Sequence, residues 1–115
     1  MRYLAAALVA LLLAACSQPV PPERIAYVGE WRAPDMRLAI TLEGNVQYER
    51  RKGSNTTRIS APIQRYDGND FIVGFGPIRT KFVVSTPPHQ VGGVWKMVVD
   101  GVELEKVRAF EGTQI

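Results

Sequence analysis

Few residues in this 115-residue chain have side chains that could do chemistry. The chain has one histidine, His89, and one cysteine, Cys16. Nucleophilic catalysis needs a base beside a Ser, Thr or Cys, and the histidine lies alone in the proline-rich sequence TPPHQ. A zinc site needs several clustered His or Cys ligands, which this composition cannot supply. We therefore expect no catalytic nucleophile and no metal site.

Paired carboxylates could act as acid and base in glycoside hydrolysis. However, Asp67 and Asp70 flank a predicted turn, and Glu103 and Glu105 lie on the predicted outward face of a strand. The glycine pair Gly92-Gly93 stands alone and does not form a phosphate-binding loop. The sequence therefore predicts no enzymatic activity and no cofactor.

The cysteine ends an uncharged apolar run, Leu4–Ala15, which follows Met1-Arg2. The run is shorter than the about 20 residues of a membrane-spanning helix and is typical of the apolar core of a signal peptide. Its end reads LAAC, which resembles the lipobox of bacterial lipoproteins. The resemblance implies that residues 1–15 are removed as a lipoprotein signal peptide and that Cys16 carries the lipid anchor. An ordinary signal peptide followed by a free thiol is the alternative.

The residue after the cysteine is Ser17. In this respect the chain resembles lipoproteins that are sorted to the outer membrane, so we expect the outer membrane as its location, with the inner membrane as the alternative. Residues 16–24 read as the lipidated cysteine and a proline-rich tether that holds the domain off the membrane. Because proline fixes φ and lacks an N–H donor, we expect this tether to pack neither as helix nor as sheet.

Residues 25–110 are expected to form one domain, followed by a C-terminal tail at 111–115. One of the 14 basic residues is Arg2, so the chain after the signal peptide carries 13 basic against 11 acidic side chains. This small excess gives a weak field, and an exported chain meets little nucleic acid, so no nucleic-acid partner is expected.

Apolar and polar residues alternate from Tyr27 onward, which predicts β-strands. Segment 85–93 reads as a long loop. A meander of about eight neighbouring strands avoids bare edges best by closing on itself, so we expect an all-β, antiparallel up-and-down meander, either a closed or a half-open barrel. The predicted strands are 27–32, 36–42, 46–51, 56–65, 70–75, 80–85, 94–99 and 102–108.

Two turn sequences predict strand registers directly. Asp100-Gly101 suits a type I′ turn and pairs Met97 with Leu104. Gly53-Ser54 suits a type II′ turn and pairs Tyr48 with Ile59 in the same way.

Three other connections are predicted to be longer loops. Glu43-Gly44-Asn45 and Asp67-Gly68-Asn69 would each place the asparagine in the left-handed region, and Gly76–Arg79 would form a four-residue loop. The expected pairs are Ile40 with Tyr48, Ile63 with Val73, and Phe71 with Val84.

The first predicted strand contains Gly29-Glu30-Trp31, which resembles the Gly-x-Trp signature of lipocalins and related calycins. The resemblance implies that Trp31 plugs one end of the barrel and that Arg108, or Lys106, covers it by a cation–π contact. The chain departs from lipocalins in its shorter strands and in lacking their disulfide. It also resembles small bacterial lipoproteins of uncharacterised function, and that resemblance carries no activity.

Four cations are predicted to gather at one hairpin tip: Arg50, Arg51 and Lys52, with Arg58 on the facing strand. Such a tip could contact an acidic envelope protein or anionic lipid, and a merely solubilising tip is the alternative.

Three function classes stay open: an interaction module of the cell envelope, a structural envelope component, and a lipocalin-like carrier of an apolar or anionic ligand. The many large side chains predicted for the interior would fill a narrow barrel, which favours the first two. The sequence gives no oligomeric state.

Overall fold

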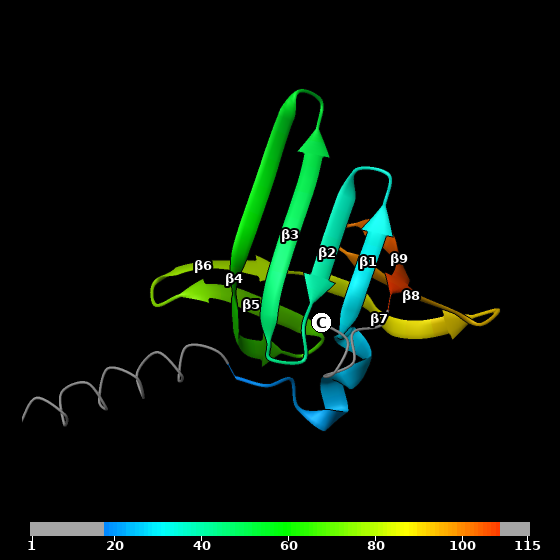
Figure 1. Ribbon diagram of the computed structural model, residues 1–115, viewed down its shortest axis with the longest axis horizontal. Helices are drawn as coiled ribbons and strands as arrows, with labels where there is room; N and C mark the ends of the chain where they lie inside the picture. Colours follow the sequence, from blue (N-terminus) through cyan, green and yellow to red (C-terminus); the bar gives the residue numbers. More distant parts are fainter. Residues whose placement is uncertain (1–17, 109–115) are drawn as a thin grey trace, which may run out of the picture.

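The computed structural model describes residues 18–108, so the predicted signal peptide, Cys16 and the predicted C-terminal tail lie outside the described residues. A 3-10 helix, η1, spans Pro22–Tyr27 and is followed by strands only (Figure 1). The strands are β1 (Gly29–Ala33), β2 (Met36–Ile40), β3 (Asn45–Lys52), β4 (Asn55–Asp67), β5 (Asp70–Phe75), β6 (Ile78–Phe82), β7 (Val84–Val91), β8 (Val94–Val99) and β9 (Val102–Arg108).

All nine strands belong to one antiparallel sheet of order β6-β5-β4-β3-β2-β1-β9-β8-β7. The sheet curls through 226° and forms a half-barrel. Its two end strands, β6 and β7, follow each other in the chain, and the Val84 N–H at the start of β7 donates to Asp70 Oδ1 of β5 at 2.7 Å. The structure thus confirms the predicted all-β antiparallel meander, in its half-open form.

The ninth strand, β7, lies where the sequence predicted the long loop 85–93, and that prediction is wrong. Pro87 and Pro88 remove two N–H donors from this segment. A strand with one neighbour tolerates such a loss, and β7 pairs with β8 alone, through register shifts around Thr86 and His89. Proline therefore marks an edge strand here.

The two predicted tight turns have the expected registers. Asp100 and Gly101 have φ angles of 49° and 79°, as a type I′ turn requires, and Met97 pairs with Leu104. Gly53 has a φ of 60°, and Tyr48 pairs with Ile59.

The loop between β2 and β3 is longer than predicted, so Ile40 pairs with Val46 instead of Tyr48. The backbone N–H of Asn45 donates to the Thr41 hydroxyl at 3.1 Å, which holds the wider loop. Gly44, with φ of 87°, takes the left-handed conformation that was predicted for Asn45.

The turns on either side of β5 are shorter than predicted. Phe75 pairs with Ile78 across a two-residue turn, so Phe71 faces Phe82 and not Val84. The turn before β5 also has two residues, yet the predicted pair Ile63–Val73 is correct because a bulge in β4 restores it.

The concave side of the half-barrel is filled with apolar side chains. Phe71 stacks on Phe82 with ring centroids 5.1 Å apart, and Tyr48 meets Phe82 edge-on at 4.9 Å. Each such buried side chain contributes about 1.5–3 kcal/mol relative to an exposed one. The largest fully buried side chains are Trp31, Phe71, Phe82, Leu38, Ile40, Met97 and Leu104.

The segment before β1 packs against the sheet, which corrects the prediction that residues 16–24 pack neither as helix nor as sheet. Val20 is buried, and its N–H donates to the Leu42 carbonyl at 2.8 Å. Prolines at the start of η1 cost no hydrogen bond, since the first N–H groups of a helix have no partner. The Tyr27 hydroxyl at the end of η1 donates to the Asn69 carbonyl at 2.9 Å. We call residues 18–27 the strap.

Candidate functional site

The β3–β4 hairpin projects beyond the rest of the sheet (Figure 1). Pairing between β2 and β3 ends at Met36–Arg50, and β4 pairs with β5 only from Ile63 onward. Residues 55–62 of β4 therefore have a strand neighbour on one side only, which is β3. The outer edge of this half of β4 offers unpaired backbone groups to a partner.

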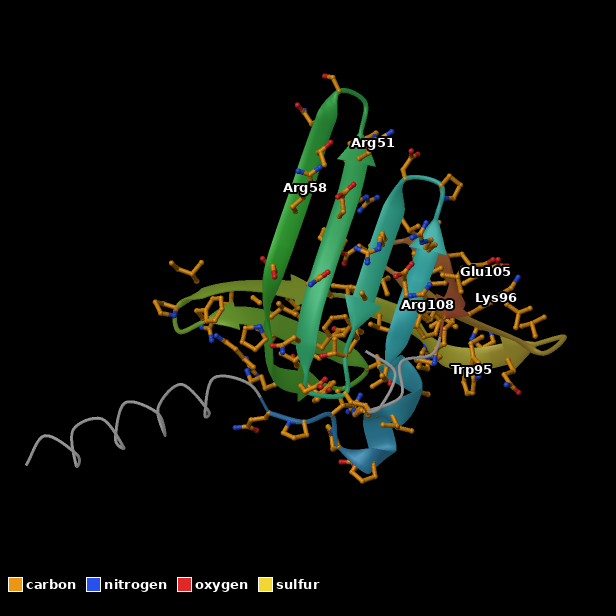
Figure 2. All side chains as sticks on the ribbon, in the orientation of Figure 1. Arg51, Arg58, Trp95, Lys96, Glu105 and Arg108 are labelled. Carbon is orange, nitrogen blue, oxygen red and sulfur yellow. The ribbon has the colours of Figure 1, made fainter. Side chains whose placement is uncertain are left out.

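The four cations predicted to share the hairpin tip divide between its two faces. Side chains alternate along a strand, so Arg50 and Lys52 lie on the face of Tyr48, whereas Arg51 lies on the face of Glu49. Arg58 pairs with Glu49 across the strands and binds its carboxylate at 3.0 Å (Figure 2). The predicted cluster of four is thus two pairs on opposite faces.

Arg50 extends the interior face toward the tip. It is half-buried and interacts with the hydroxyl of Tyr48. Burial raises the pKa of Tyr48, and the hydrogen bond from Arg50 offsets part of that rise. The structure places Arg50 beside Tyr48 at the end of the interior face.

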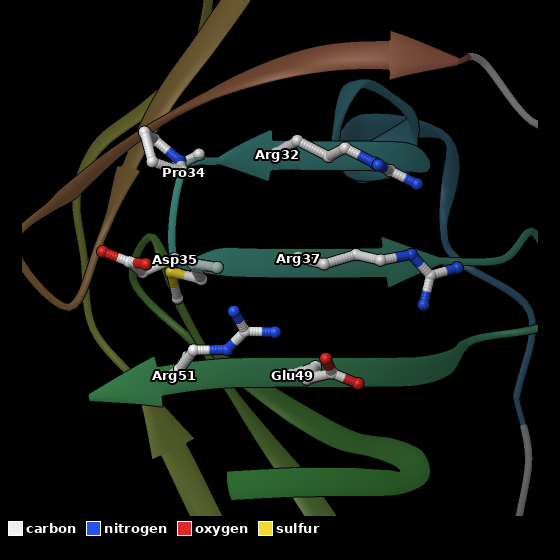
Figure 3. Close-up of a pocket in the computed structure, with 8 residues that line it drawn as sticks. Arg32, Pro34, Asp35, Arg37, Glu49 and Arg51 are labelled. Atoms are coloured by element: carbon white, nitrogen blue, oxygen red, sulfur yellow. The ribbon is translucent and has the colours of Figure 1, made fainter. Parts of the chain in front are cut away.

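The outer face of β1–β3 carries a shallow hollow of about 200 Å³ beside the hairpin (Figure 3). Arg32, Arg37 and Arg51 line it together with Asp35 and Glu49. The backbone N–H of Arg51 donates to the Asp35 carbonyl at 2.8 Å, which joins the β1–β2 turn to β3. Within residues 18–108 no acidic side chain pairs with Arg51, so its guanidinium is available to a partner.

Glu30 orders two of the arginines in this hollow. Its side chain accepts hydrogen bonds from Arg32 at 2.8 Å and from Arg37 at 3.2 Å, although Glu30 is only 8% exposed. Burial acts to raise the pKa of Glu30, but the two guanidinium hydrogen bonds outweigh it and hold the pKa below its ordinary value. The sequence reasoning missed this residue, whose only signal was a charged side chain inside the Gly-x-Trp signature.

In β1, Trp31 is fully buried and a basic residue of β9 covers it. That residue is Lys106, whose Nζ lies 5.0 Å from the centre of the Trp31 ring and 5.1 Å from that of Trp95. Arg108 was named first for this role, and that assignment is corrected. A bulge between β1 and β9 pairs Trp31 with Lys106 but Glu30 with Arg108, which changes the face of Arg108.

The residues with catalytic side-chain types are not brought together. His89 is exposed on β7, where its Nδ1 lies 3.0 Å from the Pro87 carbonyl. Glu103 and Glu105 bind Lys96, and Asp67 and Asp70 bind Lys81. Across residues 18–108 no group of three or more His, Cys, Asp or Glu side chains could hold a metal ion.

No helix within the described part of the chain is long and apolar enough to cross a membrane.

The structure defines the described part of the chain as a small all-antiparallel β half-barrel. No family model, no curated protein and no solved structure matches it.

Proposed function

We propose that this chain is a lipid-anchored protein of a bacterial cell envelope that acts, without catalysis, as an interaction module. The anchor is the lipid expected on Cys16, and the outer membrane is its expected location with the inner membrane as the alternative. The proposed contact surface is the β3–β4 hairpin.

The observation that carries this proposal is the projecting half of the hairpin. Its second strand has a free edge over residues 55–62, and Arg51 beside it has no acidic partner within the described residues. A free edge pairs with an extended segment through backbone hydrogen bonds, and guanidinium groups select acidic side chains. The best-fitting partner is therefore an acidic, extended segment of another envelope protein.

The filled interior supports an interaction module over a carrier. Trp31, Phe71, Phe82 and Met97 occupy the space that a lipocalin-like ligand would need. The hollows that the described residues line, among them the one beside Arg51, are open at the surface of the half-barrel. They are better suited to contact with a partner than to enclosing a ligand.

Two measurements test the proposal separately. Mass spectrometry of the N-terminal peptide from a bacterial host should show a chain that starts at Cys16 with a lipid on its thiol. An unmodified thiol, or cleavage elsewhere, would refute the anchor.

The partner is tested by crosslinking the full chain in envelopes and identifying the crosslinked proteins. Arg51→Glu combined with Lys52→Glu should abolish a specific crosslink. The matched control is Arg108→Glu combined with Ser85→Glu and Gln90→Glu, which changes the charge equally at exposed positions elsewhere and should leave the crosslink intact. Equal loss in both variants, or no specific crosslink, would refute the hairpin as contact surface.

A further inference from the structure

Two hairpin tips of the half-barrel carry exposed apolar pairs. At the β5–β6 tip, Phe75 is 56% exposed and Ile78 is 80% exposed. At the β7–β8 tip, Val91 and Val94 are 51% and 40% exposed. The two tips point to opposite sides of the molecule (Figure 1).

The β5–β6 pair continues the core face of its hairpin beyond the core. Phe71 faces Phe82 in the buried part, and Phe75 faces Ile78 at the tip, where no described residue covers them. Moving such side chains from water into an apolar medium is favourable. An uncovered pair of this size at the end of a hairpin is suited to insertion into a lipid surface.

The same tip lies near Gln18, at the start of the strap. Gln64 Nε2 donates to the carbonyl of Gly76, the turn residue between Phe75 and Ile78, at 3.0 Å. Gln64 also lines an open groove of about 450 Å³ together with Gln18, the first described residue. The groove therefore extends from the start of the strap to Gln64, whose side chain contacts the turn at the apolar tip.

Covalent geometry then limits how far the expected anchor can be from this tip. Cys16 is two residues before Gln18. Two extended residues span at most about 7 Å. A lipid on Cys16 would thus enter the bilayer next to the groove and the β5–β6 tip, while the β7–β8 tip lies on the far side.

The charges around the tip fit an anionic membrane surface. Arg65 lines the groove and Arg79 lies one residue from Ile78, and both side chains are exposed. Lys81 nearby forms ion pairs with Asp67 and Asp70. Arginines that form no ion pair within residues 18–108 and lie beside an apolar tip can contact lipid phosphates while the tip enters the acyl region.

We propose that the β5–β6 tip, formed by Phe75, Pro77 and Ile78, inserts into the membrane leaflet that holds the lipid on Cys16. Arg65 and Arg79 contact the headgroups. The inference rests on the proposed lipid anchor. It adds a second, non-covalent membrane contact that fixes which face of the half-barrel meets the bilayer.

The experiment uses the lipidated full chain in vesicles of phosphatidylethanolamine and phosphatidylglycerol. Ile78→Cys is labelled with an environment-sensitive fluorophore, and Val94→Cys, at the opposite tip, is the matched control. A quencher attached to the lipid acyl chains should quench the label at position 78, with a blue shift of its emission, and leave the label at position 94 unchanged.

Equal quenching at both positions, or none at position 78, would overturn the insertion. A label at position 78 that is buried without vesicles, in a chain of doubled mass, would assign the tip to a second copy and also overturn it. The mass of the N-terminal peptide reports the anchor separately. A lipidated chain with an unquenched label refutes the insertion alone, whereas a chain without lipid refutes the anchor.

Discussion

The ammonium of Lys106 lies 5.0 Å from the centre of the buried Trp31 ring and donates a hydrogen bond to the Ala26 carbonyl at 2.9 Å. Burial lowers the pKa of Lys106, and the ring and the carbonyl compensate part of the cost of burying its charge. This single side chain connects the last strand, the first strand and the strap.

Replacing Lys106 should therefore destabilise the whole half-barrel. We expect Lys106→Ala to lower the free energy of unfolding by about 1–3 kcal/mol, because the carbonyl loses its donor and Trp31 loses its cover. Urea denaturation followed by tryptophan fluorescence measures the change. Lys52→Ala, an exposed lysine at the hairpin tip, should change it by less than about 0.5 kcal/mol. Equal effects at the two lysines would contradict the role of Lys106.

The glycine of Gly29-Glu30-Trp31 is required by backbone geometry. Gly29 has φ of 143°, and a Cβ there would lie 2.8 Å from the Arg108 carbonyl oxygen and 3.0 Å from the Lys106 side chain. We expect Gly29→Ala to cost about 2 kcal/mol or more and to shift the tryptophan emission as Lys106 moves. Gly53→Ala is the control, since its φ is 60° and nothing lies within 4 Å, so that it reports the backbone cost alone. A smaller cost at position 29 than at position 53 would contradict the argument.

Acid should weaken the fold through Glu30. Its pKa in the folded chain lies below the ordinary value of 4.5, so its stabilising contribution is complete above that value. The contribution disappears as the pH falls through the lowered pKa of the folded state. Unfolding measured between pH 6 and pH 3 should show less acid sensitivity in Glu30→Gln than in the original chain. Glu49→Gln, which removes an exposed ion pair, should have the smaller effect on the change of the free energy of unfolding with pH, which is the slope that the experiment measures. An unchanged slope in Glu30→Gln would contradict this assignment.

The packing of the strap can be tested at Val20. Val20→Ala should lower the free energy of unfolding by about 1.5 kcal/mol, because about two buried methylene equivalents are lost. Glu23→Ala, at an exposed position of the same strap, should change it by less than about 0.5 kcal/mol. Both values come from denaturant titrations. A free tether would give no difference between the two variants.

Sequence patterns predicted this fold well where local chemistry decides it. The turns at Gly53 and Gly101 have positive φ angles that few other residues adopt, so their registers could be read directly. The β2–β3 loop could not, because the hydrogen bond from Asn45 to the Thr41 hydroxyl forms only in the assembled turn. The strand β7 was missed because proline reads as a loop signal, and edge position is a property of the whole sheet.

The candidate site was only partly predictable, because its geometry also depends on contacts that form only in the assembled sheet. Alternation within β3 is visible in the sequence, and it places Arg50 on the face of Tyr48 and Arg51 on the opposite face. Lys106 took the place of Arg108 because a bulge shifts the β1–β9 register by a residue, and a bulge has no reliable sequence signal. Val20 reads as a residue in a proline-rich linker, and its burial depends on Leu42 far along the chain.

The strap has a consequence for how an anchored chain would search for a partner. Because Val20 and the Gly44 loop hold the strap at the base of β3, the hairpin tip lies a whole strand away from the anchoring end, about 26 Å for its eight residues. A flexible linker would let the domain tumble and would add an entropic cost each time that it docked. With the proposed lipid on Cys16, a domain fastened at its base would keep one orientation above the bilayer, and a partner diffusing in the membrane plane would then meet the tip in that orientation.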